Sequence, residues 1–345
     1  MDRTKEAVLE LLCKNQREYL SGEALACQLK ISRTAVWKSI QILKAEGYRI
    51  KAAPHRGYQL QSVPDLLLPA EITRGLHTKI IGREIHYFPE IDSTNVRAKA
   101  LAKTGVPDGT IVIAETQTAG RGRRGRSWES PPGLGLWMTV VLRPQVPLQQ
   151  TASFTLLAAL AVVRVIKSVC DLSPRIKWPN DVLIGGRKVC GILAEASGEL
   201  EMLEYLLVGI GLNVNQDEVH FAPEVRSKAT SLRLARHQMV DRLVMARALL
   251  EELDSLYFKQ PDFAELVDLI RPHSATLGAR VRVEFTGGGS PGVAAVDGAT
   301  AGDYLTGRAV EILPDGGLLI EDDAGRQLVI HAGDVSIRGE DGNYS

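Results

Sequence analysis

Residues 117–128 concentrate the side chains best suited to hold an anion. Between Gly120 and Arg126 the segment has four arginines, three glycines and no acidic residue. Glycine lets backbone amides come close to a ligand, and arginine offers planar, permanently charged groups that match carboxylates and phosphates. No Gly-Lys-Ser or Gly-Lys-Thr follows, which excludes a Walker A loop. The composition predicts a site for a small anion, with an Arg–Gly RNA-binding tail or a solvated turn as alternatives.

The segment 177–193 places a lysine near the start of a strand. Gly185 and Gly186 separate two apolar runs, which suits a two-residue hairpin turn. Lys188 then lies at the start of the second strand and is held in one place. A lysine that simply faces solvent from the sheet is the competing interpretation.

Two further short motifs have structural explanations as well as functional ones. In residues 92–95 a strand gives way to a helix, and Ser93 or Thr94 is typical of a helix N-cap. Residues 209–213 form a Gly-x-Gly-x-Asn pattern at the end of a strand, which is weak evidence by itself. Each motif needs the others to indicate a function.

The elements that must position these motifs alternate along the middle of the chain. Strand-like and helix-like runs follow one another, which indicates an α/β or α+β core. The strand-like runs are 111–114, 136–142, 189–194 and 206–210, and the helix-like runs are 95–103, 151–169 and 238–259. Residues 63–80, with Pro64 and Pro69, are expected to form a linker to a central domain at 81–273.

Residues 1–62 are expected to bind DNA. They carry 11 lysines and arginines against 6 acidic residues, a net charge of +5, whereas the whole chain is neutral. Two helices, a turn at Ile31 and a third helix that Ser32 caps and Gly47 ends follow the helix-turn-helix order. Two short strands around residues 54–57 complete a basic wing. A solvated three-helix module that merely packs on the rest of the chain is the alternative.

In this interpretation the third helix offers its polar face to the major groove. The DNA-binding candidates are Ser32, Arg33, Thr34, Trp37, Lys38, Gln41 and, on the wing, Arg56. Arg56 could reach a phosphate. Trp37 could equally be half-buried core.

Composition indicates an ordinary globular chain of two or three domains, with 345 residues of which 45% are hydrophobic. The longest apolar stretch, 154–169, is interrupted by Arg164 and Lys167, and the N-terminus lacks an apolar signal segment. We therefore expect a cytoplasmic protein with no membrane partner. Four cysteines without Cys-x-x-Cys spacing argue against a zinc site or a disulfide framework, and we expect them to be small buried hydrophobes.

The C-terminal residues 275–338 show short strand-like runs separated by Gly and Asp turns, which is the pattern of a small β-barrel. The runs are 280–285, 307–313, 318–321 and 327–331. A Gly- and Ala-rich stretch between Thr286 and Gly302 has no assigned role.

Six segments together resemble the biotin protein ligases in order and spacing. They are 92–95, 117–126, 177–181, 187–188, 209–213 and 333–338, and the loop 120–126 is the most specific of them. With the helix-turn-helix in front, the chain is similar to the bifunctional bacterial branch of this family, which also represses a biotin operon. The resemblance implies an α+β multidomain fold. Its parts are a winged helix-turn-helix (1–62), a mixed-sheet α/β catalytic domain of the biotin/lipoate ligase type (81–273) and an SH3-like β-barrel (274–340).

The resemblance also assigns roles in the catalytic domain. It implies ATP-dependent formation of biotinyl-AMP, with Arg123 and Lys188 catalytic, and transfer of biotin to a lysine of the biotin carboxyl carrier protein of acetyl-CoA carboxylase. The residues implied to bind biotin and its adenylate are Ser93, Thr94, Asn95, Gln117, Arg121, Gly122, Arg123, Lys188 and Gly191. Trp128, Asp181 and Asn213 are implied to lie near the nucleotide.

The implied cofactors are ATP and Mg²⁺, with biotin as substrate and as precursor of the corepressor. The metal ligands and the adenine contacts within 214–228 are not indicated. The other implied partners are operator DNA and, once the adenylate is bound, a second copy of the chain. A lipoate or octanoate transferase of the same fold and a repressor with a decayed ligase are the alternatives. The Arg–Gly loop favours biotin over lipoate, and the presence of Arg123 and Lys188 favours a working ligase.

Overall fold

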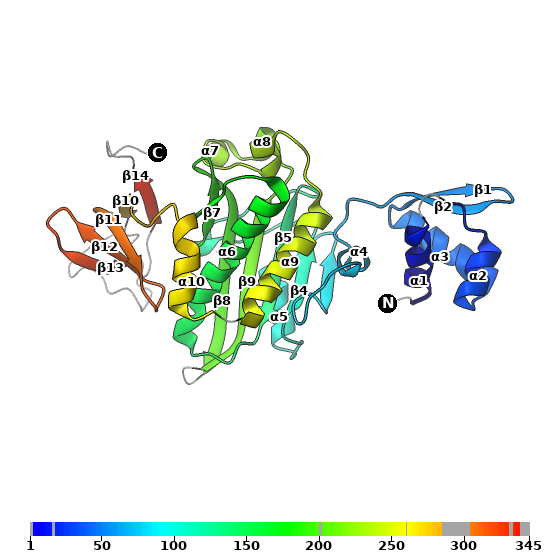
Figure 1. Cartoon of the computed structure of the whole chain (residues 1–345), viewed down its shortest axis with the longest axis horizontal. Coiled ribbons are helices and arrows are strands. Elements are labelled where there is room, and N and C mark those ends of the chain that lie inside the picture. Colours follow the sequence, from blue (N-terminus) through cyan, green and yellow to red (C-terminus); the bar gives the residue numbers. More distant parts are fainter. Residues whose placement is uncertain are drawn as a thin grey trace. The chain divides into compact units, whose positions relative to one another are not determined.

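The computed structural model describes residues 3–15, 18–199, 202–259, 261–284, 304–330 and 334–338. The chain divides into two compact units, residues 1–66 and 67–345 (Figure 1). Each unit has its own set of fully buried apolar side chains.

The N-terminal unit is a winged helix-turn-helix. Its elements are α1 (Arg3–Lys14), α2 (Gly22–Leu29), α3 (Arg33–Ala45) and a hairpin of β1 (Arg49–Ala53) and β2 (Gly57–Ser62). The side chains of Ser21 and Ser32 accept hydrogen bonds from backbone N–H groups in the first turns of α2 and α3. Gly47 follows α3 in the left-handed region, with a φ of 92°. Local side-chain chemistry therefore sets the helix boundaries.

A seven-stranded mixed sheet lies at the centre of the second unit. Its strands, in spatial order, are β3 (Ile85–Phe88), β4 (Thr110–Ala114), β5 (Gly135–Leu142), β9 (Met202–Asn213), β8 (Arg187–Glu199), β7 (Asp181–Ile184) and β6 (Arg175–Lys177). The β3–β4 pair is parallel and the other neighbours are antiparallel. This arrangement confirms the expected mixed-sheet α/β domain.

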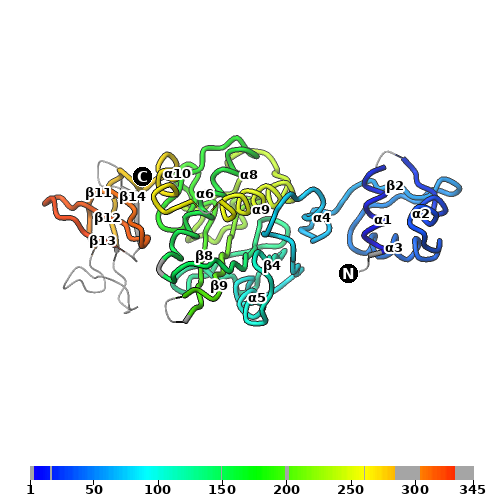
Figure 2. The backbone as a smooth tube through the Cα atoms, turned by 60° about the horizontal axis from the view of Figure 1, so that its bottom comes forward, coloured from blue at the N-terminus to red at the C-terminus, as the bar shows by residue number. Residues whose placement is uncertain are grey.

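Helices cover both faces of this sheet (Figure 2). One face carries α6 (Thr151–Cys170), α9 (Arg242–Lys259) and α10 (Phe263–Ile270), and the other carries α5 (Thr94–Ala102). Side chains alternate along a strand, so Met138 and Val140 of β5 pack in the α6 core whereas Val141 packs against α5. The shorter helices are α4 (Pro69–Thr73), α7 (Pro223–Arg226) and α8 (Leu232–Arg236). The motifs of interest lie on the α5 face.

The longest helix of the described residues is α6. By length and composition its 20 residues could cross a membrane, although Arg164 and Lys167 interrupt its apolar stretch. In the structure it packs against the sheet and α9, and 67% of its most apolar window is buried. Its place in the core accounts for its apolar character.

The C-terminal strands form a five-stranded antiparallel sheet, the small β domain that was expected. In chain order they are β10 (Arg280–Glu284), β11 (Tyr304–Ile312), β12 (Leu318–Asp322), β13 (Gln327–Ile330) and β14 (Asp334–Arg338), and the spatial order is β13-β12-β11-β10-β14. Trp178 ties this domain to the central sheet, because its backbone N–H donates to Thr276 Oγ1 and its indole N–H to the Gly316 carbonyl oxygen. The stretch 286–302 lies outside the described residues.

The connection between the two units is shorter than the expected linker 63–80. Leu67 and Ile72 are fully buried in the central core, and α4 packs on α9. Arg247 of α9 donates to the carbonyl oxygens of Glu71 and Ile72. Residues from 67 onward therefore belong to the central unit, because their apolar side chains complete its core.

Candidate functional site

A cavity of 1630 Å³ opens on the α5 face of the sheet. All twelve residues that the sequence indicated for the catalytic domain line it. They are Ser93, Thr94, Asn95, Gln117, Arg121, Gly122, Arg123, Trp128, Asp181, Lys188, Gly191 and Asn213. The fold thus brings into one site side chains that are up to 120 positions apart in the chain.

The cavity lining is strongly cationic. It includes nine lysines and arginines and only three carboxylates, which belong to Glu129, Asp181 and Glu224. A concave surface lined by one sign of charge concentrates ligands of the opposite sign. The lining therefore favours an anionic ligand, and the Arg–Gly loop supplies four of its nine cationic side chains.

The Arg–Gly loop is folded back on itself as a compact turn. Gly122 N–H donates to the Arg126 carbonyl oxygen at 2.7 Å, and Trp128 N–H donates to the Gly120 carbonyl oxygen at 2.9 Å. A short 3-10 turn (Arg123–Gly125) forms its tip. Arg123 Nη1 donates to Asn180 Oδ1 at 3.2 Å, which holds the guanidinium beside the start of β7. This loop is a defined turn, which argues against a repetitive RNA-binding tail.

Lys188 is one of the nine cationic side chains of the cavity lining, which together are called the cationic wall. Its Nζ lies 2.6 Å from Asp181 Oδ1 and 5.2 Å from the centre of the Trp128 ring. Gly185 and Gly186 make the predicted hairpin turn between β7 and β8, with φ values of 56° and 76°. The side chain of Lys188 is one-third exposed, and it faces the cavity rather than open solvent.

Glycines form the floor on which Trp128 rests. Gly191 of β8 and Gly211 of β9 are cross-strand partners. A Cβ on Gly211 would lie 2.5 Å from Trp128 Nε1, and a Cβ on Gly191 would lie 2.9 Å from the far edge of the same ring. The indole therefore lies directly on the strand backbones, and the second glycine of the 209–213 motif has a steric role.

Ser93 and Thr94 do not cap α5 as the local pattern suggested. Ser93 occupies the N-cap position, but its side chain makes no capping hydrogen bond. The free N–H of Thr94 is satisfied instead by Gln117 Oε1 at 2.8 Å, and Gln117 Nε2 donates to Ser130 Oγ at 2.8 Å. A side chain from a distant loop thus replaces the local cap, and the Ser93 hydroxyl is left to line the cavity.

Asn213, at the end of β9, holds the segment that follows this strand. Its Nδ2 donates to the Thr230 carbonyl oxygen at 3.0 Å, and its Oδ1 accepts from Gln216 Nε2 at 3.0 Å. Thr230 N–H in turn donates to the Lys188 carbonyl oxygen at 2.8 Å. Seven residues of the segment 221–229 line the cavity, although the sequence offered no motif within 214–228.

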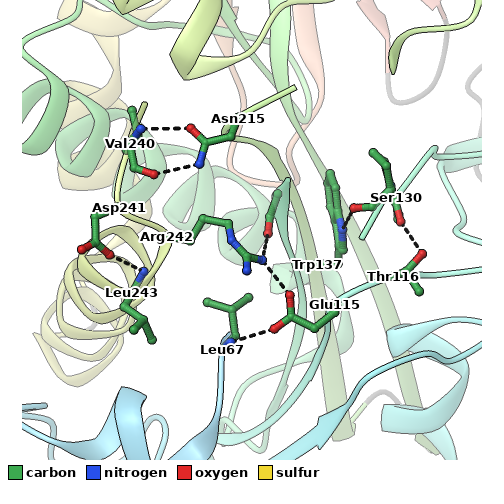
Figure 3. A network of polar contacts seen from close by, with 12 residues as sticks. Leu67, Glu115, Thr116, Ser130, Trp137, Asn215, Val240, Asp241, Arg242 and Leu243 are labelled. Carbon is green, nitrogen blue, oxygen red and sulfur yellow. Dashed lines mark hydrogen bonds and ion pairs between the residues drawn. The ribbon is translucent and has the colours of Figure 1, made fainter. Parts of the chain in front are cut away.

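A buried ion pair anchors the two ends of the segment that contains the Arg–Gly loop (Figure 3). Arg242 is fully buried and donates to Glu115 Oε2 at 2.8 Å and to the Gly135 carbonyl oxygen at 3.3 Å. The other Glu115 oxygen accepts from Leu67 N–H at 2.7 Å. Burial, followed by the Glu115 carboxylate, raises the pKa of Tyr87 to about 12. Sequence analysis missed this pair because its members are 127 positions apart.

The cysteines divide into two kinds. Cys170 and Cys190 are buried, and burial raises the pKa of both thiols. Cys13 is half-buried and Cys27 is exposed, so the expectation of four buried hydrophobes is wrong for Cys27, which faces solvent from α2. Within the described residues no cluster of three His, Cys, Asp or Glu side chains could hold a metal.

The N-terminal unit presents the expected polar face on α3. Val36, Ile40 and Leu43 are buried, whereas the predicted DNA-binding residues are exposed. These exposed residues are Ser32, Arg33, Thr34, Trp37, Lys38, Gln41 and, on the wing, Arg56. Trp37 is 53% exposed, which argues against a place in the core. The Arg56 guanidinium lies 4.3 Å from the centre of the Tyr19 ring, which supports it at the wing.

Comparison with known proteins agrees with this division. Residues 87–213 match the biotin/lipoate A/B protein ligase family, and residues 4–59 match a helix-turn-helix domain family. The bifunctional ligase/repressor BirA of Bacillus subtilis is 36% identical over 330 residues, which cover 95% of this chain and 97% of the relative. A biotin–(acetyl-CoA-carboxylase) ligase of Mycobacterium tuberculosis is 36% identical over 283 residues, covering 79% of this chain and 97% of that protein.

Solved structures give the same answer for the second unit. The biotin protein ligase of Aquifex aeolicus in complex with biotin and ATP aligns with a TM-score of 0.57 and 30% identity. The alignment covers 74% of this chain and 99% of that one. The chain belongs to the bifunctional ligase/repressor family of biotin protein ligases.

Proposed function

We propose that this chain joins biotin to a lysine of the biotin carboxyl carrier protein of acetyl-CoA carboxylase, through biotinyl-AMP, and represses a biotin operon in response to biotin. The observation that carries the ligase function is the meeting of Arg121, Arg123 and Lys188 in one cavity, which is also lined by the buried residues at the start of α5. Its relatives are named as ligases and as ligase/repressors of this kind.

The first reaction must bring two anions together. A carboxylate oxygen of biotin attacks the α-phosphorus of ATP, the bond to the bridging oxygen breaks, and pyrophosphate leaves. Arg123 and Lys188 are proposed to be catalytic because they offset the repulsion and stabilise the charge that develops on phosphorus. Neither residue forms a covalent bond with the substrate. Arg121 and Gly122 would close over the adenylate and keep water away from its mixed anhydride.

The second reaction needs no further side-chain nucleophile. The neutral amine of the carrier lysine attacks the acyl carbon of biotinyl-AMP, an amide bond forms, and AMP leaves with the electron pair of the broken bond. The amine proton is lost to solvent or to the departing phosphate. Shielding of the adenylate by the loop makes this amine, rather than water, its acceptor.

The cavity gives each end of the ligand a place. Ser93, Thr94, Asn95 and Gln117 surround the recess at the start of α5, which we assign to the ring of biotin. Gly191 would let the acyl chain or adenylate approach the sheet backbone beside Lys188. Trp128, Asp181 and Asn213, which line the same cavity, are assigned to the nucleotide side.

Mg²⁺ is part of this proposal. Magnesium in such sites is held through one or two carboxylates and substrate phosphates. Asp181 fits that role as a carboxylate of the cavity lining, which the ion would share with Lys188, since Asp181 Oδ1 lies 2.6 Å from Lys188 Nζ. Both side-chain polar atoms of Asn213 have protein partners. When bound, the ion would supply charge neutralisation to the phosphates.

The repressor function is assigned to the exposed face of α3 and the wing. A two-fold dimer could bind two operator half-sites at once, and the adenylate would strengthen binding if it favoured the dimer. Among the described residues β7 pairs with β8 only as far as Gly191, so the outer edge of β8 beyond Ile192 has no partner strand. Such an edge can add a strand from a second copy of the chain. We propose that the protein acts in the cytoplasm, where ATP and operator DNA are both present.

The ligase function is tested by pyrophosphate–ATP isotope exchange. Exchange stimulated by biotin but not by lipoate is expected, because the Arg–Gly loop favours biotin. Stimulation by lipoate instead would favour a lipoate or octanoate transferase. Transfer of labelled biotin to an apo carrier domain excludes a repressor with a decayed ligase.

The regulatory function needs its own measurement. Operator affinity should increase when ATP and biotin are supplied together. Equal affinity with and without them would remove the repressor part of the proposal and leave the ligase part intact.

A further inference from the structure

Asn95 lies across three strands beneath the start of α5. Thr139 of β5, Gly209 of β9 and Leu193 of β8 are cross-strand neighbours in one row. A Cβ on Gly209 would lie 2.2 Å from Asn95 Oδ1, so the glycine leaves the space that the amide occupies. The amide of Asn95 can therefore reach from β5 to β8.

The Asn95 amide is held at both ends. Its Nδ2 donates to Glu195 Oε2 at 2.6 Å and lies 3.5 Å from the Leu193 carbonyl oxygen. Its Oδ1 accepts from the Thr139 hydroxyl at 2.6 Å. A carboxylate and a carbonyl can only accept hydrogen bonds, so the NH₂ group must face β8 and the oxygen must face Thr139.

This orientation determines the direction of the neighbouring hydroxyl groups. Thr139 has one hydroxyl proton, and Asn95 Oδ1 takes it. Thr94 Oγ1 lies 2.9 Å from Thr139 Oγ1 and 3.1 Å from Gln117 Oε1, and either oxygen can accept the single proton of Thr94. The proton of Thr94 is used inside the protein, and its hydroxyl offers lone pairs to the cavity that it lines.

We infer that Thr139 and Glu195 are positioning residues that make Thr94 a hydrogen-bond acceptor toward the ring N–H groups of biotin. Neither residue lines the cavity, and Thr139 is fully buried, so both act through Asn95 and Thr94. A ureido ring carries two N–H donors, and a site with committed acceptors binds such donors without first reorienting its own hydroxyl groups. The inference rests on the proposed biotin function and adds the polarity of one end of that site.

The test compares two variants of the full-length protein at one position. Thr139→Val keeps the shape of the side chain and removes the hydroxyl, whereas Thr139→Ser keeps the hydroxyl. In biotin-dependent pyrophosphate–ATP exchange, Thr139→Val should raise the KM for biotin about tenfold, because the buried acceptor Asn95 Oδ1 loses the hydroxyl that donates to it. The KM for ATP should change less than about twofold, and Thr139→Ser should restore the KM for biotin to within about threefold of the wild type. Desthiobiotin, which keeps the ureido ring, should be weakened by the same factor.

Two results on the Thr139 variants would contradict the inference. A Thr139→Val protein that binds biotin as tightly as the wild type overturns the inference, as does an equal loss in Thr139→Ser, which would mean that shape alone matters. If Thr139→Val fails to fold, Glu195→Leu and Glu195→Gln provide the same contrast at the other end of the amide, since glutamine keeps an acceptor. Absence of biotin-dependent exchange in the wild type would instead refute the proposed function.

Discussion

Substitution of Gly211 by alanine should disable adenylation through the displacement of one ring. The added Cβ would lie 2.5 Å from Trp128 Nε1, and ordinary van der Waals contact begins near 3.4 Å, so the indole must withdraw by about 0.9 Å. The strand backbone beneath cannot give way, because Gly211 pairs with both Gly191 and Trp137 in the middle of the sheet. A misplacement of about 1 Å in a positioning group can cost about 100-fold in rate.

The expected result is therefore a fall of about 100-fold in kcat/KM for biotin-dependent pyrophosphate–ATP exchange. Overpacking costs about 1–3 kcal/mol of unfolding free energy, and a urea titration of the same variant should show a loss in this range. The double variant Gly211→Ala, Trp128→Phe is the matched control. The new methyl group meets Nε1, Cε2 and Cζ2 of the indole, and the smaller single ring of phenylalanine reduces this overlap, so activity should recover in part.

Two results would refute this reasoning. Full activity in Gly211→Ala would mean that the ring position is not important for adenylation. Equal inactivity in the single and double variants, with the fold intact, would mean that the methyl group blocks the ligand directly rather than through Trp128.

Four other expectations follow from the structure. Arg242→Leu should lower the free energy of unfolding by about 3–5 kcal/mol, because Glu115 is left buried without its cation, and a loss below about 1 kcal/mol in a urea titration would contradict the pairing. Lys188→Met should slow adenylate formation by about 100-fold or more in a rapid-quench assay, and an unchanged rate would exclude its catalytic role. Burial and three neighbouring cations lower the pKa of His273 below 6.5, so the unfolded chain takes up this proton first and stability should fall as pH drops below about 6.5. His273→Gln should reduce that slope, and an identical slope would contradict the assignment. Lys38→Ala should reduce by about one the slope of the logarithm of operator affinity against the logarithm of salt concentration, because one phosphate contact is lost. An unchanged slope would place Lys38 away from the DNA backbone.

The N-terminal unit could be predicted almost completely from its sequence. Ser21 and Ser32 cap their helices, and Gly47 ends the third, through contacts that span three to five residues. Such local contacts are visible in the order of residues alone. The exposure of Trp37 could not be predicted, because an aromatic side chain on a helix fits core and surface equally well.

The cavity residues were predicted by composition and by resemblance, whereas their supports were not. Thr139 stands out only as one hydroxyl in the otherwise apolar strand β5, and Glu195 is one of two glutamates in β8. Their partner Asn95 is about 44 and 100 positions away. Ser93 does occupy the N-cap position, but the capping hydrogen bond expected from its side chain is absent for the same reason, since Gln117 reaches the helix from a distant loop. Contacts of this kind depend on strand order, which no local pattern contains.

The connection between the units shows a different limit. Pro64, Pro69 and a short apolar run are typical of a linker, yet Leu67 and Ile72 are fully buried. An apolar run next to prolines can be a linker or a core segment, and only the presence of α9 decides between them. The β3 strand has four half-buried residues and gave no alternating pattern to detect.

The most direct test of the central claim is a single-turnover incubation of the purified protein with ATP, magnesium and labelled biotin. The wild type should retain one equivalent of biotinyl-AMP and release pyrophosphate, and Arg123→Ala and Lys188→Ala should not accumulate the adenylate. If the wild type forms no acyl-nucleotide, or if both variants form it at the wild-type rate, the cationic wall does not join biotin to AMP and the account of this site is wrong.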